Sequence, residues 1–356
     1  MTTIEEPPAK TAASSEPSPS VLRPIARMIL LPALGALLGF VLLEKVLLPI
    51  IGVGSVERIV QLGQHLDEPL SPAPTVALLG NSITREGIDT RLLAESAPAG
   101  WHAQNLAISG CSINEMRVQL PKVLAARPAA VAIGLRPEDL GRTDDMDLDK
   151  AFAYAKGGFV TAWPMDWTRA DFPGISVEAY EALRSTPLAQ DMHFRTALLN
   201  MINQEVRLRF RRGLRRVAPD NWTDPYEMAF NVRDNRLERH LESTLHDMRE
   251  LLKEERTGAT LIEKMATEIH EAGAIPILII LPMHPAFGDD MLQPVTDLRA
   301  LTARLASERS GLVVDALDVL SANEFADALH PNAEGREVYS RFVGHALEPL
   351  ATTSKK

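Results

Sequence analysis

Cysteine is almost absent from this chain. The single cysteine, Cys111, excludes an intramolecular disulfide framework and any cysteine-rich metal site. Basic residues are also in deficit, since 37 Lys and Arg against 47 Asp and Glu give a formal net charge of −10. General binding to a phosphate backbone needs a basic surface, so nucleic acid is not an expected partner. The chain also has no Gly-x-Gly-x-x-Gly fingerprint, no P-loop and no His-Glu-x-x-His motif. We therefore expect no cofactor and no metal.

One long apolar run lies near the N-terminus. Residues 1–20 are rich in Pro, Ser, Ala, Thr and Glu, a composition typical of a disordered tail. Residues 28–43 are uncharged and apolar, and the run continues beyond Glu44 and Lys45. A helix that crosses a bilayer needs about 20 such residues. Residues 21–53 are therefore predicted to be a transmembrane anchor, and a buried core helix or a cleaved signal peptide are the alternatives.

Two arginines precede this run. Arg23 and Arg27 favour a cytoplasmic N-terminus, because positive charges beside a span tend to stay on the cytoplasmic side. The sequence thus predicts a membrane-anchored protein whose remaining part lies in the periplasm or elsewhere outside the cytoplasm. Residues 54–74, which end in a stretch rich in Pro and Ser, are expected to be a linker.

From residue 75 onward, short apolar runs alternate with helical patterns. The apolar runs are typical of buried parallel strands, and they span 75–79, 104–108, 129–133, 275–281 and 312–315. The helical patterns span 113–126, 261–272, 291–309 and 333–347. Residues 75–350 therefore predict a doubly wound α/β domain with a mostly parallel five-stranded sheet. Such sheets place their active sites at the carboxyl ends of the strands.

A long stretch, residues 140–258, separates the third apolar run from the fourth. It contains three of the four tryptophans, a basic helical pattern at 198–217 and a helical pattern of mixed charge at 237–255. We interpret the stretch as a helical insertion or cap. The arginines of the basic pattern are typical of a solvated face, and contact with anionic lipid or glycan is the alternative.

Two polar motifs fall where such a sheet would carry its chemistry. Gly80-Asn81-Ser82 follows the first apolar run, at a turn that exposes a serine and backbone N–H groups. A lone serine there is otherwise a turn residue or a helix N-cap. Asp327 and His330 precede the last helix, and their spacing lets the carboxylate fix the imidazole while the far ring nitrogen takes a proton from serine. Alone, this pair fits a surface carboxylate and a capping histidine equally well.

Together the motifs resemble the SGNH, or GDSL-like, superfamily of esterases and acyltransferases. Residues 80–82 look like its first block, which is usually Gly-Asp-Ser, and Gly110 matches the glycine of the second block. The segment Asp327-x-x-His330-Pro-Asn-x-x-Gly335 looks like the fifth block. The resemblance covers roughly residues 75–140 and 273–348, and it implies an SGNH-like fold with flavodoxin-type strand order.

The resemblance also implies roles for individual residues. Ser82 would be the nucleophile, His330 the general base and Asp327 its orienting carboxylate. The N–H groups of Ser82 and Gly110 would donate to the oxyanion. A third donor, an Asn of the third block, is missing, because Arg136 stands in that block instead. Arg136 could supply charge to the oxyanion in its place, or only the two backbone donors remain.

Two further residues are candidate contacts for a substrate. Asn81 replaces the usual aspartate of the first block beside the nucleophile. His284 follows the fourth apolar run and so lies at the carboxyl edge of the predicted sheet. A histidine in such a loop is otherwise structural or simply exposed.

This chain combines a predicted membrane anchor, the missing Asn and a long insertion. In this it looks like the cell-envelope members of the superfamily, which move acetyl or other acyl groups onto polysaccharides. The resemblance therefore implies chemistry on an acyl ester through an acyl-serine intermediate. The substrate would be an acylated small molecule or carbohydrate, and a membrane acyl-donor protein would be a partner. The alternative is a catalytically degenerate domain that binds a glycan or scaffolds an envelope complex.

Overall fold

The computed structural model describes residues 34–35, 39, 55–70, 74–141, 146–194, 196, 237–253, 256–288 and 290–355. By its contacts the chain divides into two compact units, residues 1–51 and 52–356. In the first unit, Leu34, Gly35 and Gly39 are described, and all three are helical.

The predicted N-terminal tail, residues 1–20, lies outside the described residues. The same holds for the predicted anchor of residues 21–53, apart from the three helical positions just named. Both stay predictions. Within the part of the chain that the structure describes, no helix has the length and apolarity needed to cross a membrane.

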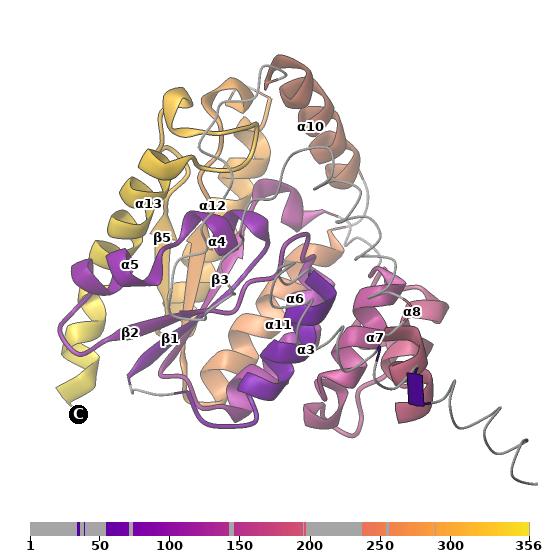
Figure 1. Ribbon diagram of the computed structural model, residues 1–356. Coiled ribbons are helices and arrows are strands. Elements are labelled where there is room, and N and C mark those ends of the chain that lie inside the picture. The colour runs from indigo at the N-terminus through magenta and orange to yellow at the C-terminus, as the bar shows by residue number, and fades with distance from the viewer. Residues whose placement is uncertain are drawn as a thin grey trace, which may run out of the picture. The chain divides into compact units, whose positions relative to one another are not determined.

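The second unit is built on a parallel sheet that has five strands among the described residues (Figure 1). The strands lie in the order β2, β1, β3, β4, β5, and each neighbouring pair is parallel. This is the flavodoxin-type order, so the predicted doubly wound α/β fold is confirmed. The strands are β1 (Thr75–Leu79), β2 (His102–Asn105), β3 (Ala130–Leu135), β4 (Ile275–Ile280) and β5 (Leu312–Asp315).

Helices cover both faces of this sheet. Helices α5 and α13 pack together on one face, while α6, α11 and α12 cover the other. The α-helices are α3 (Ser55–His65), α4 (Ser82–Gly87), α5 (Thr90–Ser96), α6 (Ile113–Ala125), α7 (Leu148–Lys156), α8 (Val177–Leu183), α10 (Leu237–Leu252), α11 (Thr257–Glu271), α12 (Leu292–Glu308) and α13 (Ala333–Ala346). The 3₁₀ helices are η2 (Pro137–Leu140), η3 (Val160–Ala162), η4 (Arg169–Asp171), η5 (Pro285–Phe287), η6 (Ala322–Glu324) and η7 (Glu348–Lys355).

The central strands are uninterrupted apolar runs because both of their faces are buried. All residues of β1 and β3 are buried. Val76, Ala132 and Ile277, on three adjacent strands, share one core cluster with Tyr339 and Val343 of α13. Parallel sheets covered on both sides need such continuous runs, which explains why the strand pattern could be recognised from sequence.

The strand positions agree with the sequence except around β2. The run at 104–108 was expected to be the strand, but β2 begins at His102 and ends at Asn105. Beyond it, Leu106 N donates to Leu78 O at 2.9 Å and Ile108 N donates to Gly80 O at 3.1 Å. The chain therefore continues beside β1 as a hydrogen-bonded loop that leads to Gly110.

Helix α3 lies inside the expected linker of residues 54–74. Its Ile59 and Leu62 are fully buried, and the helix packs against α7. Arg58 is also buried and donates to Ala107 O at 3.0 Å and to Asn105 O at 2.8 Å, which ties α3 to the end of β2. The structure thus differs from the expected linker, because an amphipathic helix joins the α/β unit before β1 begins.

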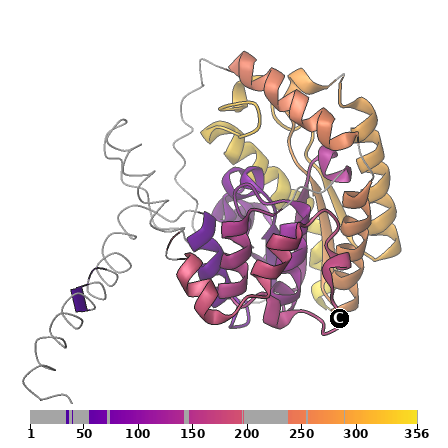
Figure 2. The same ribbon diagram turned by 90° about the vertical axis from the view of Figure 1, so that its right-hand side faces the viewer.

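The described parts of the predicted insertion, residues 140–258, are largely helical, as expected. Figure 2 shows α7 and α8 side by side, with α10 apart from them, and α10 contacts η2 and η5. Trp163 and Trp167 pack with Phe172, with ring centroids 4.7 to 5.6 Å apart. The basic pattern at 198–217 lies outside the described residues.

Candidate active site

Ser82 lies at the carboxyl end of β1, as the first residue of α4. Asn81 caps this helix, since its Oδ1 accepts a hydrogen bond from Ile83 N at 2.9 Å. Gly80 allows the tight turn, because a Cβ there would lie 2.2 Å from Thr84 Oγ1. The short strand-to-helix turn therefore fixes the position of the serine at the edge of the sheet.

The loop before α13 carries Asp327 and His330. Oδ1 of Asp327 accepts hydrogen bonds from Leu329 N and His330 N, both at 2.8 Å, so the carboxylate organises its own loop. Its Oδ2 lies 2.8 Å from Nδ1 of His330. The carboxylate therefore fixes the imidazole with its proton on Nδ1, so that Nε2 is the nitrogen that can accept a proton.

Ser82 and His330 meet although they are far apart in the sequence. His330 Nε2 lies 2.8 Å from Ser82 Oγ. This distance falls within the hydrogen-bond range of about 2.6–3.2 Å expected for a nucleophile and its base. The three residues that the sequence singled out thus form an unbroken chain of contacts from hydroxyl to imidazole to carboxylate.

The charges around His330 favour its protonated form. Burial by itself lowers the pKa of His330, but the hydrogen bond to Asp327 and the negative charges of Glu86 and Asp327 outweigh burial and leave this pKa above its ordinary value. Burial raises the pKa of Asp327, but the hydrogen bond from His330 and those from two backbone N–H groups bring it below the ordinary value. Both directions describe one stabilised ion pair, which forms when His330 takes up a proton.

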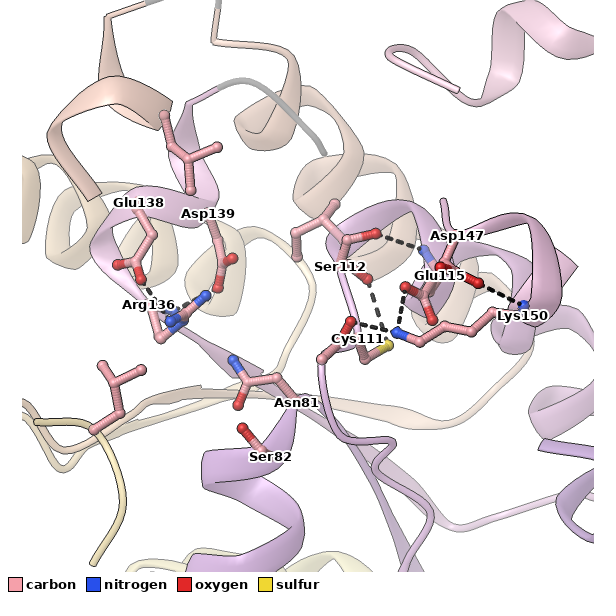
Figure 3. A pocket seen from close by; sticks show the side chains of 14 residues that line it. Asn81, Ser82, Cys111, Ser112, Glu115, Arg136, Glu138, Asp139, Asp147 and Lys150 are labelled. Carbon is pink, nitrogen blue, oxygen red and sulfur yellow. Dashed lines mark hydrogen bonds and ion pairs between the residues drawn. The ribbon is translucent and has the colours of Figure 1, made fainter. Parts of the chain in front are cut away.

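A cavity of about 330 Å³ opens beside Ser82 (Figure 3). Arg136, Glu138 and Asp139 lie together at one side of it, with Ser112, Glu115 and Lys150 at the other and Asn81 and Ser82 between the two groups. The lining is Asn81, Ser82, Gly110, Cys111, Ser112, Ile113, Glu115, Arg136, Glu138, Asp139, Asp147, Lys150, Leu251 and Leu329. Most of these side chains are polar or charged.

Gly110 lies in this wall, in a backbone conformation that favours glycine. Its φ is +65°, a value that residues with a Cβ rarely adopt. The turn is held on both sides, because Cys111 N donates to Ile108 O at 3.1 Å and Lys150 Nζ donates to Gly110 O at 2.5 Å. The structure therefore brings Gly110 into the same cavity as Ser82, and its role as an oxyanion donor stays a prediction.

Arg136 also lines the cavity, but its charge is partly balanced. Its Nη1 lies 2.8 Å from Oε1 of Glu138, and its backbone N–H donates to Asp139 Oδ2 at 2.7 Å. The charge of Arg136 acts to lower the pKa of His330, which is consistent with its position near the imidazole. The geometry thus keeps Arg136 within the site, and its role at the oxyanion stays a prediction.

The two candidate substrate contacts lie in different places. Asn81 lines the main cavity, although its Oδ1 is engaged in capping α4. His284 is 5% exposed and lines a separate, much smaller cavity of about 10 Å³. Its Nδ1 accepts a hydrogen bond from Ala286 N at 3.2 Å, and its ring packs against Phe325. These contacts hold the backbone and the core, and the role of His284 in binding substrate stays a prediction.

Two residues of the site were not singled out by the sequence. Glu86, one helical turn after Ser82, has its Oε2 at 3.5 Å from His330 Nε2. Lys150, from α7 of the insertion, reaches both Gly110 and Glu115. The four-residue spacing of Ser82 and Glu86 is the signal that could have revealed the first, because it places two side chains on one face of a helix.

Cys111 lines the cavity without the properties of a nucleophile. Burial, followed by the nearby charge of Glu115, raises the pKa of its thiol well above the ordinary value. A thiol of this kind carries little thiolate at neutral pH. Among the described residues, no group of three or more His, Cys, Asp or Glu is arranged to hold a metal ion.

Fold and site together define an α/β domain that presents a serine, a histidine and an aspartate in sequential contact. No family model and no curated protein matches the chain. Similar solved structures include a GDSL-like lipase from Bacteroides thetaiotaomicron, with 12% identity and a TM-score of 0.40 over 83% of this chain and 98% of the lipase. Another is an acetylxylan esterase from Geobacillus stearothermophilus, with 13% identity and a TM-score of 0.41 over 78% of this chain and 95% of the esterase. Similarity at this level does not carry an activity over to this chain.

Proposed function

We propose that this chain is a serine-dependent enzyme of the SGNH type that acts on acyl esters through an acyl-serine intermediate. The observation that supports this most directly is the pair of contacts of His330, at 2.8 Å to Ser82 Oγ and at 2.8 Å to Asp327 Oδ2. A nucleophile, a base and an orienting carboxylate in this geometry are the arrangement required for acyl transfer.

The reaction begins when Ser82 Oγ attacks the ester carbonyl and His330 Nε2 takes its proton. The carbonyl oxygen becomes an oxyanion, for which the N–H groups of Ser82 and Gly110 and the charge of Arg136 are the proposed partners. The C–O bond to the leaving alcohol then breaks, and His330 returns the proton to that alcohol. An acyl-serine remains.

His330 next removes a proton from the acceptor, which attacks the acyl-serine. The bond between the acyl carbon and Ser82 Oγ then breaks, and His330 returns the proton to Oγ. Water as acceptor gives a carboxylic acid, and a sugar hydroxyl gives a new ester. Both outcomes use the same residues and the same proton route. Exclusion of water and the fit of the acceptor decide between them.

The carboxylates of the cavity lining support a hydroxyl-rich substrate, and the modest cavity volume of about 330 Å³ supports a small acyl group. Glu138, Asp139 and Asp147 bring carboxylates to the lining, and carboxylates accept hydrogen bonds from hydroxyl groups. We therefore propose O-acyl transfer, acetyl in the first instance, to or from a polysaccharide of the cell envelope.

The proposal extends to where this chemistry takes place. Residues 21–53 would anchor the enzyme with its N-terminus in the cytoplasm and its catalytic domain outside, and a membrane acyl-donor protein would be its partner. A reporter active only outside the cytoplasm should work when fused after Lys356. Activity only of a reporter that requires the cytoplasm would overturn this part.

Covalent labelling tests the activity itself. A fluorophosphonate should label the wild-type protein at Ser82, and the same protein should hydrolyse p-nitrophenyl acetate. Ser82→Ala should lose both. Binding of a glycan without labelling or turnover would instead support the alternative of a catalytically degenerate binding domain. The missing Asn of the third block is the observation that motivates this alternative.

A further inference from the structure

A second carboxylate lies against the base. Glu86 is buried on α4, with a side chain 10% exposed, and its Oε2 lies 3.5 Å from His330 Nε2. The same nitrogen lies 2.8 Å from Ser82 Oγ. Ser82 and Glu86 are four residues apart, so α4 presents both to the same imidazole nitrogen.

Oε2 of Glu86 accepts no hydrogen bond from the described residues in this geometry. A buried oxygen without a donor destabilises the fold, so its presence here calls for an explanation. The neighbouring nitrogen, His330 Nε2, carries no proton of its own while it accepts a hydrogen bond from Ser82 Oγ. Once Nε2 has taken the proton of Ser82, the imidazole becomes a positively charged imidazolium, and its N–H group lies beside Glu86 Oε2.

The other carboxylate oxygen is held in place. Ser109 Oγ donates to Oε1 of Glu86 at 3.4 Å, and Arg85 Nη1 donates to Ser109 Oγ at 3.0 Å. Ser109 directly precedes Gly110, so the loop with the proposed oxyanion donor also orients Glu86. The carboxylate therefore has a fixed position relative to the imidazole.

We propose that Glu86 is a positioning residue that acts through His330, as a second carboxylate that stabilises the imidazolium formed in each half of the reaction. The proton still moves from Ser82 Oγ to Nε2 and on to the leaving alcohol. Glu86 takes up no proton in the cycle and lowers the energy of the state in which Nε2 holds it. This inference rests on the function proposed above.

Other charges act on the same pair and set what a mutation should do. Asp327 and Arg136 face His330 in addition to Glu86, and Arg85 and Asp327 face Glu86 in addition to His330. Burial raises the pKa of Glu86, while His330 and Arg85 oppose the rise. Among the groups that raise the pKa of His330, Glu86 is the one that can be neutralised without touching the contact to Asp327.

Glu86→Gln is the informative change, because glutamine keeps the shape and an oxygen for Ser109 but removes the charge. The pKa of His330 should fall, so the acid limb of the pH profile of kcat/KM should move to lower pH. The plateau should drop by about tenfold, since a stabilising charge is missing when the imidazolium forms. Glu86→Asp, which keeps the charge on a shorter side chain, should lie between Gln and wild type.

The matched control is Glu95→Gln on α5. Glu95 is exposed and pairs with Arg341 at 3.2 Å, so this variant removes the same charge from the outer surface. Its pH profile and plateau should equal those of the wild type. Thermal unfolding of each variant separates a loss of fold from a loss of the charge at His330.

The decisive experiment follows His330 directly in the full chain. Histidine labelled with ¹³C at Cε1 is titrated by NMR, and His330→Gln assigns the signal. A lower pKa of His330 in Glu86→Gln but not in Glu95→Gln supports the proposal, whereas equal titration in all three proteins overturns it. Because this readout needs no turnover, a shifted titration in a protein without fluorophosphonate labelling would refute the proposed function and leave the Glu86 contact standing.

Discussion

Replacing Lys150 tests how the insertion stabilises the Gly110 turn beside Ser82. Lys150 Nζ donates to Gly110 O at 2.5 Å and to Glu115 Oε1 at 3.0 Å. The side chains of Lys150 and Glu115 are 13% and 3% exposed. The first contact fixes the peptide that follows Gly110, and the second compensates a buried negative charge. Lys150→Met retains most of the side-chain volume and removes both contacts.

The structure sets the size of the expected loss in stability. Removing one partner of a buried ion pair typically costs about 3–5 kcal/mol, because the other charge is left uncompensated. Here we expect the lower end, about 3 kcal/mol. Tyr154 Oη still donates to Glu115 Oε2 at 3.1 Å, and the carboxyl can take up a proton. For a folded unit of this size, that loss corresponds to a fall in Tm of about 6–12 °C.

The loss should depend on pH with a definite sign. Burial raises the pKa of Glu115, and Lys150 opposes that rise. A carboxyl whose pKa is raised on folding favours the folded state below its unfolded-state pKa, and this advantage is lost as pH rises through the folded-state pKa. Without Lys150 the pKa of Glu115 should rise further. Urea unfolding should therefore show a larger deficit of Lys150→Met against wild type at about pH 8 than at about pH 5.

A double variant separates the buried charge from the position of the loop. Lys150→Met with Glu115→Gln removes both charges and should recover much of the stability. It should not recover turnover, because Gly110 O still lacks its donor, and misplacing one oxyanion donor costs about 10²-fold in kcat. If the double variant regained wild-type turnover, or if Lys150→Met lost neither stability nor turnover, Lys150 would not hold the Gly110 turn.

Three further predictions concern the catalytic contacts. Ser82→Ala and His330→Ala should each abolish nearly all hydrolysis of a p-nitrophenyl ester, with the double variant little worse and Asp327→Ala less severe; additive losses would argue against a single catalytic unit. Arg136→Ala should lower kcat by about 10² or more in protein that thermal unfolding shows to be folded at the assay temperature, whereas a change below about threefold would restrict Arg136 to its ion pair with Glu138. Because the pKa of His330 is raised and its neutral form is the base, kcat/KM of the wild type should increase with pH through a value above that of free histidine, about 6.5. A profile already flat at about pH 6 would contradict this.

The contacts of Ser82, His330 and Asp327 were predictable because each depends on local sequence and one topological rule. The turn after β1 needs the glycine at position 80, and the loop of Asp327 closes through hydrogen bonds to its own backbone N–H groups. The parallel order then places β1 next to the centre of the sheet and α13 over it. Both motifs meet at the carboxyl edge as a result.

Other parts of the site were not readable in this way. Lys150 reaches Gly110 from a different helix, and no local pattern pairs these residues. The proximity of Glu86 to His330 can be predicted only once α4 is known to begin at Ser82. Helix α3 was missed because its buried apolar positions, Ile59, Val60 and Leu62, are interspersed with polar residues in a stretch that ends in Pro and Ser.

The described parts of the insertion pack against the edge of the sheet that carries Ser82. The chain leaves the α/β fold at Gly141 and returns at Gly258, where Gly258 N donates to Gly141 O at 2.8 Å. A Cβ on Gly258 would lie 1.9 Å from Asp139 O, so the two ends of the insertion close tightly beside η2, which carries Glu138 and Asp139. Lys150 and Leu251, from the described parts of the insertion, complete the cavity wall. Changes within the insertion can therefore alter what enters the cavity, while β1 and the loop before α13 keep Ser82 and His330 in contact.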